Sequence, residues 1–266
     1  MTHWEFPATG PIDLDISLLS GQIAIAAEAT EVITVSLAGS GPGNTGDGHT
    51  AGIRVDFADG RLEIIEPEKR GIRIRSSGSD LAVKVPVGSR CIVRSSASSV
   101  SCQGELGSLD VRTASGDVTA TVVRGPVQVT TFSGAIDLDE ALADVAAHTT
   151  SGDIRLHRAG GEVDATTTSG DIHIGAAAAS VTARAASGSV RVDSIATGNA
   201  DLGCVSGDVT VAVVPGADVY LDLASVIGRV SSDLEPSGQD SQADLRIKCR
   251  TVNGDVRVTK VVLAAS

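Results

Sequence analysis

A short pattern that returns every 18 residues constrains this chain more than any other feature. Serine and glycine are followed, after one more residue, by valine or isoleucine. The pattern begins at Ser115, Ser133, Ser151, Ser169, Ser187 and, after a step of 19, at Ser206. A fixed period of this kind is typical of repeat proteins. We therefore expect a fold made of stacked copies of one short unit.

Each repeat contains a weaker period of nine residues, in which a small residue precedes an aliphatic one by two positions, as in Gly116/Val118 and Gly125/Val127. Apolar and polar residues then alternate, which indicates strands, and no part of the block has helical spacing. Two strands per 18 residues describe one coil, and coils stack about 4.8 Å apart. The sequence predicts an all-β fold, a parallel β-solenoid with right-handed crossovers.

Stacking places residues 18 apart in one column and predicts the core. One strand of each coil should contribute Val118, Ile136, Ile154, Ile172, Val190 and Val209, and also Ala120, Leu138, Leu156, Ile174, Val192 and Val211. The other strand should contribute Val111, Val129, Ala147, Ala165, Ala183 and Leu202, and also Val127, Val145, Val163 and Val181. Opposed small and large residues fit a thin interior.

The spacing predicts one β-solenoid domain over residues 1–266. Residues 91–212 form the regular repeats, and 10–90 form irregular N-terminal coils, of which 10–38 begin or cap the stack. Ala58 to Arg61 separate two short apolar runs and predict a hairpin. Residues 213–266 are less regular, with an insertion near 235–242 and a last strand from Val256. We expect that strand to form an open edge at which a partner or a second copy could bind.

The composition excludes several classes of function. The formal net charge is −12, and lysine and arginine are not clustered, which argues against nucleic acid and anionic membrane surfaces as partners. The first residues lack a basic start with an apolar run, and no window is long enough to span a membrane. The sequence therefore predicts a cytoplasmic protein.

The four cysteines, Cys91, Cys102, Cys204 and Cys249, lack the spacing of a metal site or a disulfide framework. All four fall on inward positions. Cys204 occupies the column of Thr149 and Thr167, and Cys249 that of Ala147. We expect buried, reduced side chains that behave as small apolar residues.

The repeated unit resembles the bacterial "putative adhesin" family of β-strand-repeat proteins, a domain of unknown function with a β-solenoid fold. The likeness covers residues 10 to 262 and includes the opening Gly10-Pro11-Ile12-Asp13-Leu14 and the segments Val85-Pro86-Val87-Gly88 and Val214-Pro215-Gly216. It implies a fold and an adhesin-like binding role, but no catalytic residues.

One outward surface of the repeats carries ionisable side chains. Asp137, Arg155, His173 and Arg191 should share a column, and Asp139, His157 and Asp193 the column beside it. We interpret them as a cross-strand ladder that relieves repulsion between stacked like charges. The alternative is a metal site or an acid/base pair at Asp139, His157 and His173.

Two other motifs have simpler interpretations. Gly43 to Thr50 has the spacing of a phosphate-binding loop, but a histidine replaces the required lysine, which favours an ordinary loop. The repeated Gly-Asp corners share a feature with calcium-binding β-rolls, yet a hard cation needs six or more oxygens. We expect the corner serine and aspartate side chains to bond the turn backbone.

These observations predict a protein without enzymatic activity, cofactor or metal, which presents a rigid polar β-surface or an open solenoid end to a protein partner. A carbohydrate-active β-helix enzyme is one alternative, although such enzymes line their grooves with aromatic residues, and these are only 2% of this chain. A structural protein that assembles through its ends is the other alternative.

Overall fold

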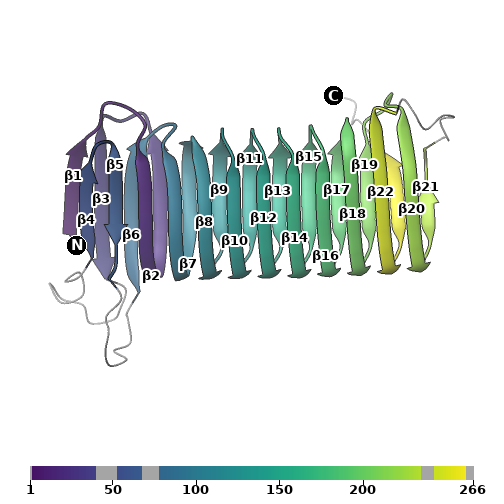
Figure 1. Cartoon of the computed structure of the whole chain (residues 1–266), viewed down its shortest axis with the longest axis horizontal. Helices are drawn as coiled ribbons and strands as arrows, with labels where there is room; N and C mark the ends of the chain where they lie inside the picture. The colour runs from purple at the N-terminus through teal and green to yellow at the C-terminus, as the bar shows by residue number, and fades with distance from the viewer. Residues whose placement is uncertain (1, 40–52, 68–77, 235–242, 262–266) are drawn as a thin grey trace. The chain divides into compact units, whose positions relative to one another are not determined.

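The computed structural model of the chain describes residues 2–39, 53–67, 78–234 and 243–261. Within these ranges the chain is all-β and contains no helix, as predicted (Figure 1). None of the described residues forms a helix long and apolar enough to cross a membrane. The chain divides into two compact units, Met1–Gly134 and Ala135–Ser266. The single domain over residues 1–266 and the right-handed crossover stay predictions.

The N-terminal unit contains ten of the labelled strands. They are β1 (Thr2–Pro7), β2 (Asp13–Glu28), β3 (Val32–Gly39), β4 (Arg54–Ala58), β5 (Arg61–Ile65), β6 (Ser79–Pro86), β7 (Arg90–Leu106), β8 (Ser108–Ser115), β9 (Val118–Val123) and β10 (Val127–Ser133). The long strands β2 and β7 each turn a corner and supply both sides of a coil.

The C-terminal unit contains the remaining labelled strands, and every pair among them is parallel. They are β11 (Ile136–Ala141), β12 (Val145–Ser151), β13 (Ile154–Ala159), β14 (Val163–Ser169), β15 (Ile172–Ala177), β16 (Val181–Ser187), β17 (Val190–Ile195), β18 (Gly198–Ser206), β19 (Val209–Val213), β20 (Val219–Ile227), β21 (Val230–Ser232), β22 (Leu245–Asn253) and β23 (Val256–Lys260).

The predicted registry is confirmed within each unit. In the C-terminal unit, Ile136 pairs with Ile154, which pairs with Ile172, and the row continues through Val190 to Val209. In the N-terminal unit, Val118 pairs with Val100. All of these side chains are almost fully buried. The interior of each unit therefore consists of continuous rows of aliphatic side chains, one residue per coil.

The glycine at the corner of each coil is required by the close stacking of the chain. Gly21 has φ +134°, and a β-carbon there would lie 1.9 Å from the carbonyl oxygen of Ser79 in the next coil. A β-carbon at Gly228 would likewise lie 1.9 Å from the carbonyl oxygen of Gly254. A side chain at either corner would push stacked coils apart. This clash explains why glycine returns with the period of the coil.

The last coils of the C-terminal unit do not stack in sequence order, and here the prediction of a terminal edge strand is wrong. β23 pairs with β19 on one side and with β21 on the other, so Val256 lies between Val209 and Val230. β22 lies in the same way between β18 and β20. The outermost coil is therefore β20 and β21. Spacing could not show this order, since residues 213–234 fit the repeat pattern as well as residues 245–260 do.

The N-terminal unit contains an equivalent insertion, so the prediction that residues 10–38 begin or cap the stack is only partly right. β2 is interior, because its first half pairs with β5 and β7 and its second half with β6 and β7. β3 does lie farther out. It pairs antiparallel with β6 and with β1, while β4 pairs antiparallel with β5.

The predicted hairpin is confirmed as β4 and β5. Asp59 and Gly60 both have positive φ, 51° and 76°, which is the backbone of a two-residue turn of the type favoured between antiparallel strands. Antiparallel strands thus form the outer layer of the N-terminal unit beyond the parallel coils.

Candidate functional site

The outward ladder of the C-terminal unit lies in the predicted register. Asp137 pairs with Arg155, Arg155 with His173, and His173 with Arg191. The neighbouring column places Asp139 opposite His157, since the residues on either side of them are paired in that order. Most charges on this surface therefore have an opposite charge on an adjacent strand.

The candidate residues separate into two clusters. Asp137, Asp139 and His157 come together, with one ligand atom of each within 4.8 Å of the others, and His157 Nε2 is 3.5 Å from Asp137 Oδ1. His173 instead contacts Asp193, with Nε2 2.6 Å from Oδ2. His157 and His173 are thus oriented toward different carboxylates.

In the second cluster, the negative charge of Asp193 is neutralised by its neighbours. Arg191 Nε donates to Asp193 Oδ1 at 2.5 Å, while His173 occupies the other carboxylate oxygen. Partial burial of Asp193 raises its pKa, but the hydrogen bonds from His173 and Arg191 outweigh this and the net effect lowers the pKa. The carboxylate is therefore held in its ionised form by a fixed cation and a ring nitrogen.

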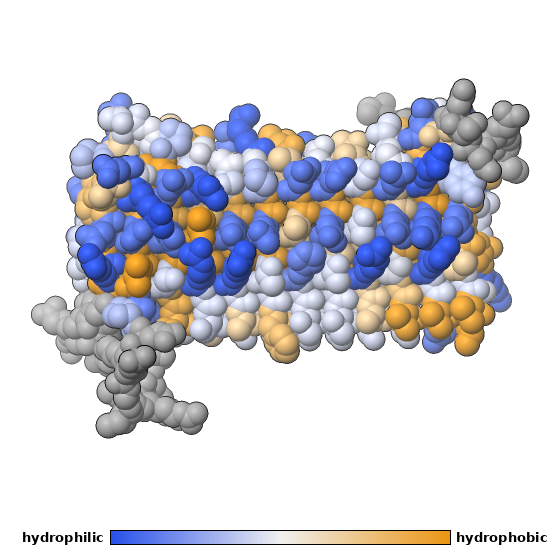
Figure 2. Space-filling view, in the orientation of Figure 1, coloured by the Kyte–Doolittle hydropathy of each residue, from blue (hydrophilic) through white to orange (hydrophobic). Residues whose placement is uncertain are grey.

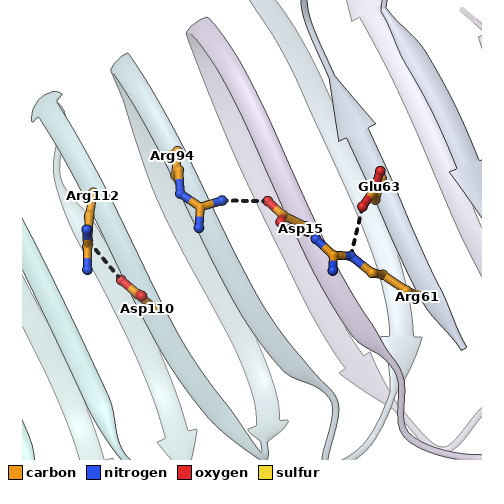
Figure 3. A network of polar contacts seen from close by, with 6 residues as sticks. All are labelled: Asp15, Arg61, Glu63, Arg94, Asp110 and Arg112. Carbon is orange, nitrogen blue, oxygen red and sulfur yellow. Dashed lines mark hydrogen bonds and ion pairs between the residues drawn. The ribbon is translucent and has the colours of Figure 1, made fainter.

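The N-terminal unit has a comparable ladder (Figure 3). Asp15 on β2 accepts hydrogen bonds at 2.9 Å from Arg61 of β5 and from Arg94 of β7. Arg61 also pairs with Glu63 at 2.9 Å, and Arg112 pairs with Asp110 at 3.5 Å. Both units therefore neutralise acidic residues with arginines of the same or a neighbouring strand, which supports the interpretation as a charge ladder.

The corner aspartates bond the turn backbone, as predicted. Asp153 Oδ1 accepts from the amide of Asp171, and Asp171 Oδ1 accepts from the amide of Ser189, at 3.0 and 2.8 Å. Asp208 Oδ1 does the same for the amide of Asp255 at 2.8 Å. One oxygen of each of these carboxylates already has a donor, which leaves fewer ligands for a calcium ion. The loop Gly43 to Thr50 lies outside the described residues.

The cysteines are free and buried, as predicted. Burial raises the pKa of Cys102 and of Cys249 to about 12, and it also raises the pKa of Cys91 and Cys204. The thiolate is the form that attacks substrates and binds metals. These thiols stay protonated near neutral pH and offer no nucleophile.

The outermost coil of the C-terminal unit has a different surface from the coils beneath it. Leu221 and Leu223 of β20 belong to inward columns in which the paired residues, Ile247 and Cys249, are buried, yet both leucines are only half-buried. Among the described residues β20 pairs with β22 alone. Core side chains of this coil are therefore partly exposed.

An apolar column runs along the outside of the same strands. The register places Val205 of β18 beside Val252 of β22, and Val252 beside Val226 of β20. These valines are 54%, 45% and 76% exposed. Figure 2 shows the corresponding apolar surface at the lower right, where these three strands end. The earlier coils carry Thr168 and Ala186 in this column, so the change to valine was visible in the sequence but not its place at the outermost coil.

A shallow hollow adjoins the valine column. Gly203 lies between Arg184 and Arg250 in an outward column, and the missing side chain leaves a depression that Thr168 and Val205 also line. The two arginines are paired with Asp201 and Asp222, each at 3.1 Å. The arginines that line the hollow are therefore close to charge balance.

Comparison with known proteins places the chain in a family. It is an all-β solenoid, and the model of the family described as Toastrack DUF4097 matches residues 12–259. The chain belongs to this family, which confirms the resemblance seen in the repeats. A search of curated proteins finds no match.

Several solved structures are similar to this chain. A "putative adhesin" from Bacteroides fragilis is 12% identical, with 97% of this chain and 96% of that chain covered and a TM-score of 0.50. A "putative lipid binding protein" from Parabacteroides distasonis is 13% identical, with 98% and 96% covered and a TM-score of 0.39. A "putative adhesin" from Parabacteroides merdae is 10% identical, with the same coverage and a TM-score of 0.31. At these identities the first likeness shows the fold alone.

Proposed function

We propose that this chain is a non-enzymatic binding protein whose recognition surface is the outermost coil of its C-terminal unit. The observation that carries the proposal is the partial exposure of Leu221 and Leu223 on a strand that pairs, among the described residues, with β22 alone. An exposed, regular edge strand is a template for another strand. Native proteins usually protect such an edge, and one left open with apolar side chains indicates a partner.

The partner we propose is a protein segment in extended conformation that adds a strand beside β20. Backbone hydrogen bonds would supply affinity, and alternate side chains would supply specificity. Side chains on one face of the added strand would cover Leu221 and Leu223, and those on the other would pack near Tyr220 and Val226, which are 39% and 76% exposed. The adhesin-like names of similar structures support a binding role of this general kind.

The absence of enzymatic activity is part of the proposal. The buried thiols have raised pKa values, and the Asp193 carboxylate is already bound by His173 and Arg191. Carbohydrate-active enzymes usually bind sugars on aromatic side chains in a groove. Tyr220 is exposed on the outermost coil, but no second aromatic ring among the described residues stacks with it. A screen for polysaccharide turnover should give no product.

The experiment compares partner binding by the wild-type chain and by Val226→Lys, which introduces charge on the outward face of β20 without removing a buried side chain. Proteins captured from the native cell extract are purified, and their affinity is measured by calorimetry. Phe132→Lys is the matched control, because Phe132 is 63% exposed and belongs to the other unit. We expect Val226→Lys to weaken binding about tenfold or more and Phe132→Lys to leave it unchanged.

Hydrogen exchange of the complex locates the contact. The proposal requires new protection of amides in β20 and β21. Protection confined to β13 and β15 would instead assign binding to the polar face and overturn it. A purified chain that is dimeric by light scattering, with β20 protected at high concentration, would show that the edge binds a second copy.

A further inference from the structure

One cluster on the outward polar surface departs from the pairing of opposite charges in the charge ladder. Asp137 and Asp139 are two residues apart on β11 and both point outward, so their carboxylates lie on the same face. The outward pair at this spacing on β17, Arg191 and Asp193, combines opposite charges at 2.5 Å. On β11 the second member is another acid, and like charges this close repel each other.

Neighbouring arginines do not compensate this pair. Arg155 stands opposite Asp137 in the register, but its guanidinium donates to Asp153 Oδ2 at 2.7 Å. Within the described part of the chain, no hydrogen bond or ion pair joins Asp139 to a basic side chain. β2 shows the contrast: it also carries two acids at this spacing, Asp13 and Asp15, and there both Arg61 and Arg94 bind Asp15.

A histidine completes the cluster on β11 and β13. One ligand atom from each of Asp137, Asp139 and His157 lies within 4.8 Å of the other two. All three side chains are at least partly exposed, so small rotamer changes could bring the atoms closer together without disturbing the core. Two carboxylate oxygens and one imidazole nitrogen on one side leave the remaining positions of a bound ion open to solvent.

We propose that Asp137, Asp139 and His157 form a site for a divalent transition-metal ion, of which Zn²⁺ is the test case. Carboxylate oxygen and imidazole nitrogen together suit zinc and its neighbours in the first transition row. Calcium and magnesium prefer all-oxygen sites, so the imidazole selects against them. The ion would supply the positive charge that an arginine provides elsewhere on this surface.

The cluster of His173, Asp193 and Arg191 is an internal control. It has the same acid–histidine contact, but Arg191 occupies the column in which the first cluster has Asp137. The guanidinium already neutralises the carboxylate, and a metal ion would be repelled. Two clusters of similar composition and exposure should therefore respond to metal in opposite ways.

The test is calorimetric titration of the full chain with Zn²⁺. We expect one saturable site per chain, weakened about tenfold or more by His157→Ala or by Asp139→Asn and changed less than about twofold by His173→Ala. Millimolar Mg²⁺ or Ca²⁺ should not displace the zinc. The ring nitrogens of ¹⁵N-labelled His157, but not of His173, should shift in the NMR spectrum when zinc is added.

Two results would overturn the proposal. One is the absence of saturable heat at millimolar zinc, and the other is a zinc affinity that survives His157→Ala. All substitutions are on the surface, and circular dichroism with thermal melting confirms that each variant is folded. Because the partner surface lies on β20, loss of zinc binding and loss of partner binding are separate outcomes.

Discussion

The two units end their stacks of coils in different ways. In the N-terminal unit, antiparallel strands β1, β3 and β4 lie beyond the parallel coils, and Leu62 of β5 is fully buried. In the C-terminal unit the outermost described coil is β20 and β21, and Leu223 is only half-buried. Both units place a coil from near a chain terminus, β2 or β22–β23, inside the stack.

An inward direction alone therefore does not bury a residue in this fold. Each coil covers its neighbour on one side only. An inward side chain is therefore fully buried only where a strand lies on both sides of its own strand. The N-terminal unit adds antiparallel strands as that last cover. The C-terminal unit leaves its last column half-covered, and the stability of the end coil should be correspondingly low.

The corner glycines should show the largest difference. Gly21→Ala would force a β-carbon to within 1.9 Å of a backbone oxygen inside a covered stack, and we expect a loss of about 3 kcal/mol or more in unfolding free energy. Gly228→Ala creates an equal clash, but the end coil can separate locally, so the global loss should be below about 1 kcal/mol.

Denaturant unfolding measures the global effect, and hydrogen exchange of β20 and β21 measures the local one. Equal losses of global unfolding free energy for the two variants would mean that the outermost coil is as stable as the interior, which would contradict the expected difference between the two units.

The buried leucines should show the next largest effect. Leu62→Ala removes a fully buried side chain and should cost about 2–5 kcal/mol in unfolding free energy. Leu223→Ala removes a side chain that water already reaches, and it should cost about 1 kcal/mol. Chemical denaturation of both variants checks this, with Phe132→Ala as an exposed control. A Leu223→Ala loss as large as that of Leu62→Ala would show that the outermost coil is covered after all.

Alkaline pH should destabilise the fold through the buried thiols. Burial raises the pKa of Cys102 and Cys249 from the ordinary thiol value of 9.0 to about 12, so between these values the folded chain binds more protons than the unfolded chain. Stability is therefore retained below about pH 9 and falls as the pH rises. The fall should be about 1.4 kcal/mol per pH unit for each thiol.

Cys102→Ala should remove the contribution of one thiol from the pH dependence of the unfolding free energy. Denaturant unfolding at pH 8, 9 and 10 measures this change. Cys249 pairs with Leu223 of the end coil. If that coil opens at alkaline pH, Cys249→Ala should relieve less of the slope than Cys102→Ala. An unchanged slope in both variants would contradict the assignment to thiols.

The ion pairs should show the smallest effect. Asp15 is 18% exposed and bound by two arginines, whereas Asp222 is 42% exposed and, among the described residues, is bound by Arg250 alone. We expect Asp15→Asn to cost about 1 kcal/mol and Asp222→Asn less than about 0.5 kcal/mol. Thermal melts at low and high salt test this, since screening should reduce both losses. A larger loss of stability for Asp222→Asn than for Asp15→Asn would contradict the expected order of the two units.

Much of the candidate surface could be predicted from spacing, and the missing part has a physical cause. The columns that contain Asp137, Asp139, His157 and His173 follow from the period of 18. The partner of each side chain does not, because an outward side chain can reach the same coil or either neighbour. His173 turned to Asp193 for this reason, and His157 lies nearer to Asp137 than a straight column implies.

The repeat pattern was enough to predict the coil, including its length, its strands, the glycine at its corner and the side chains that fill its interior. These depend on contacts between residues a fixed number of positions apart, and a repeated pattern records such contacts directly. Tertiary contacts set the order of the coils near the chain termini, the antiparallel cover of the N-terminal unit and the partly covered strand β20. Any coil can stack on any other when their inward residues match. The order of the coils therefore depends on which apolar surfaces are buried against each other, and a repeated pattern along the chain does not record this choice.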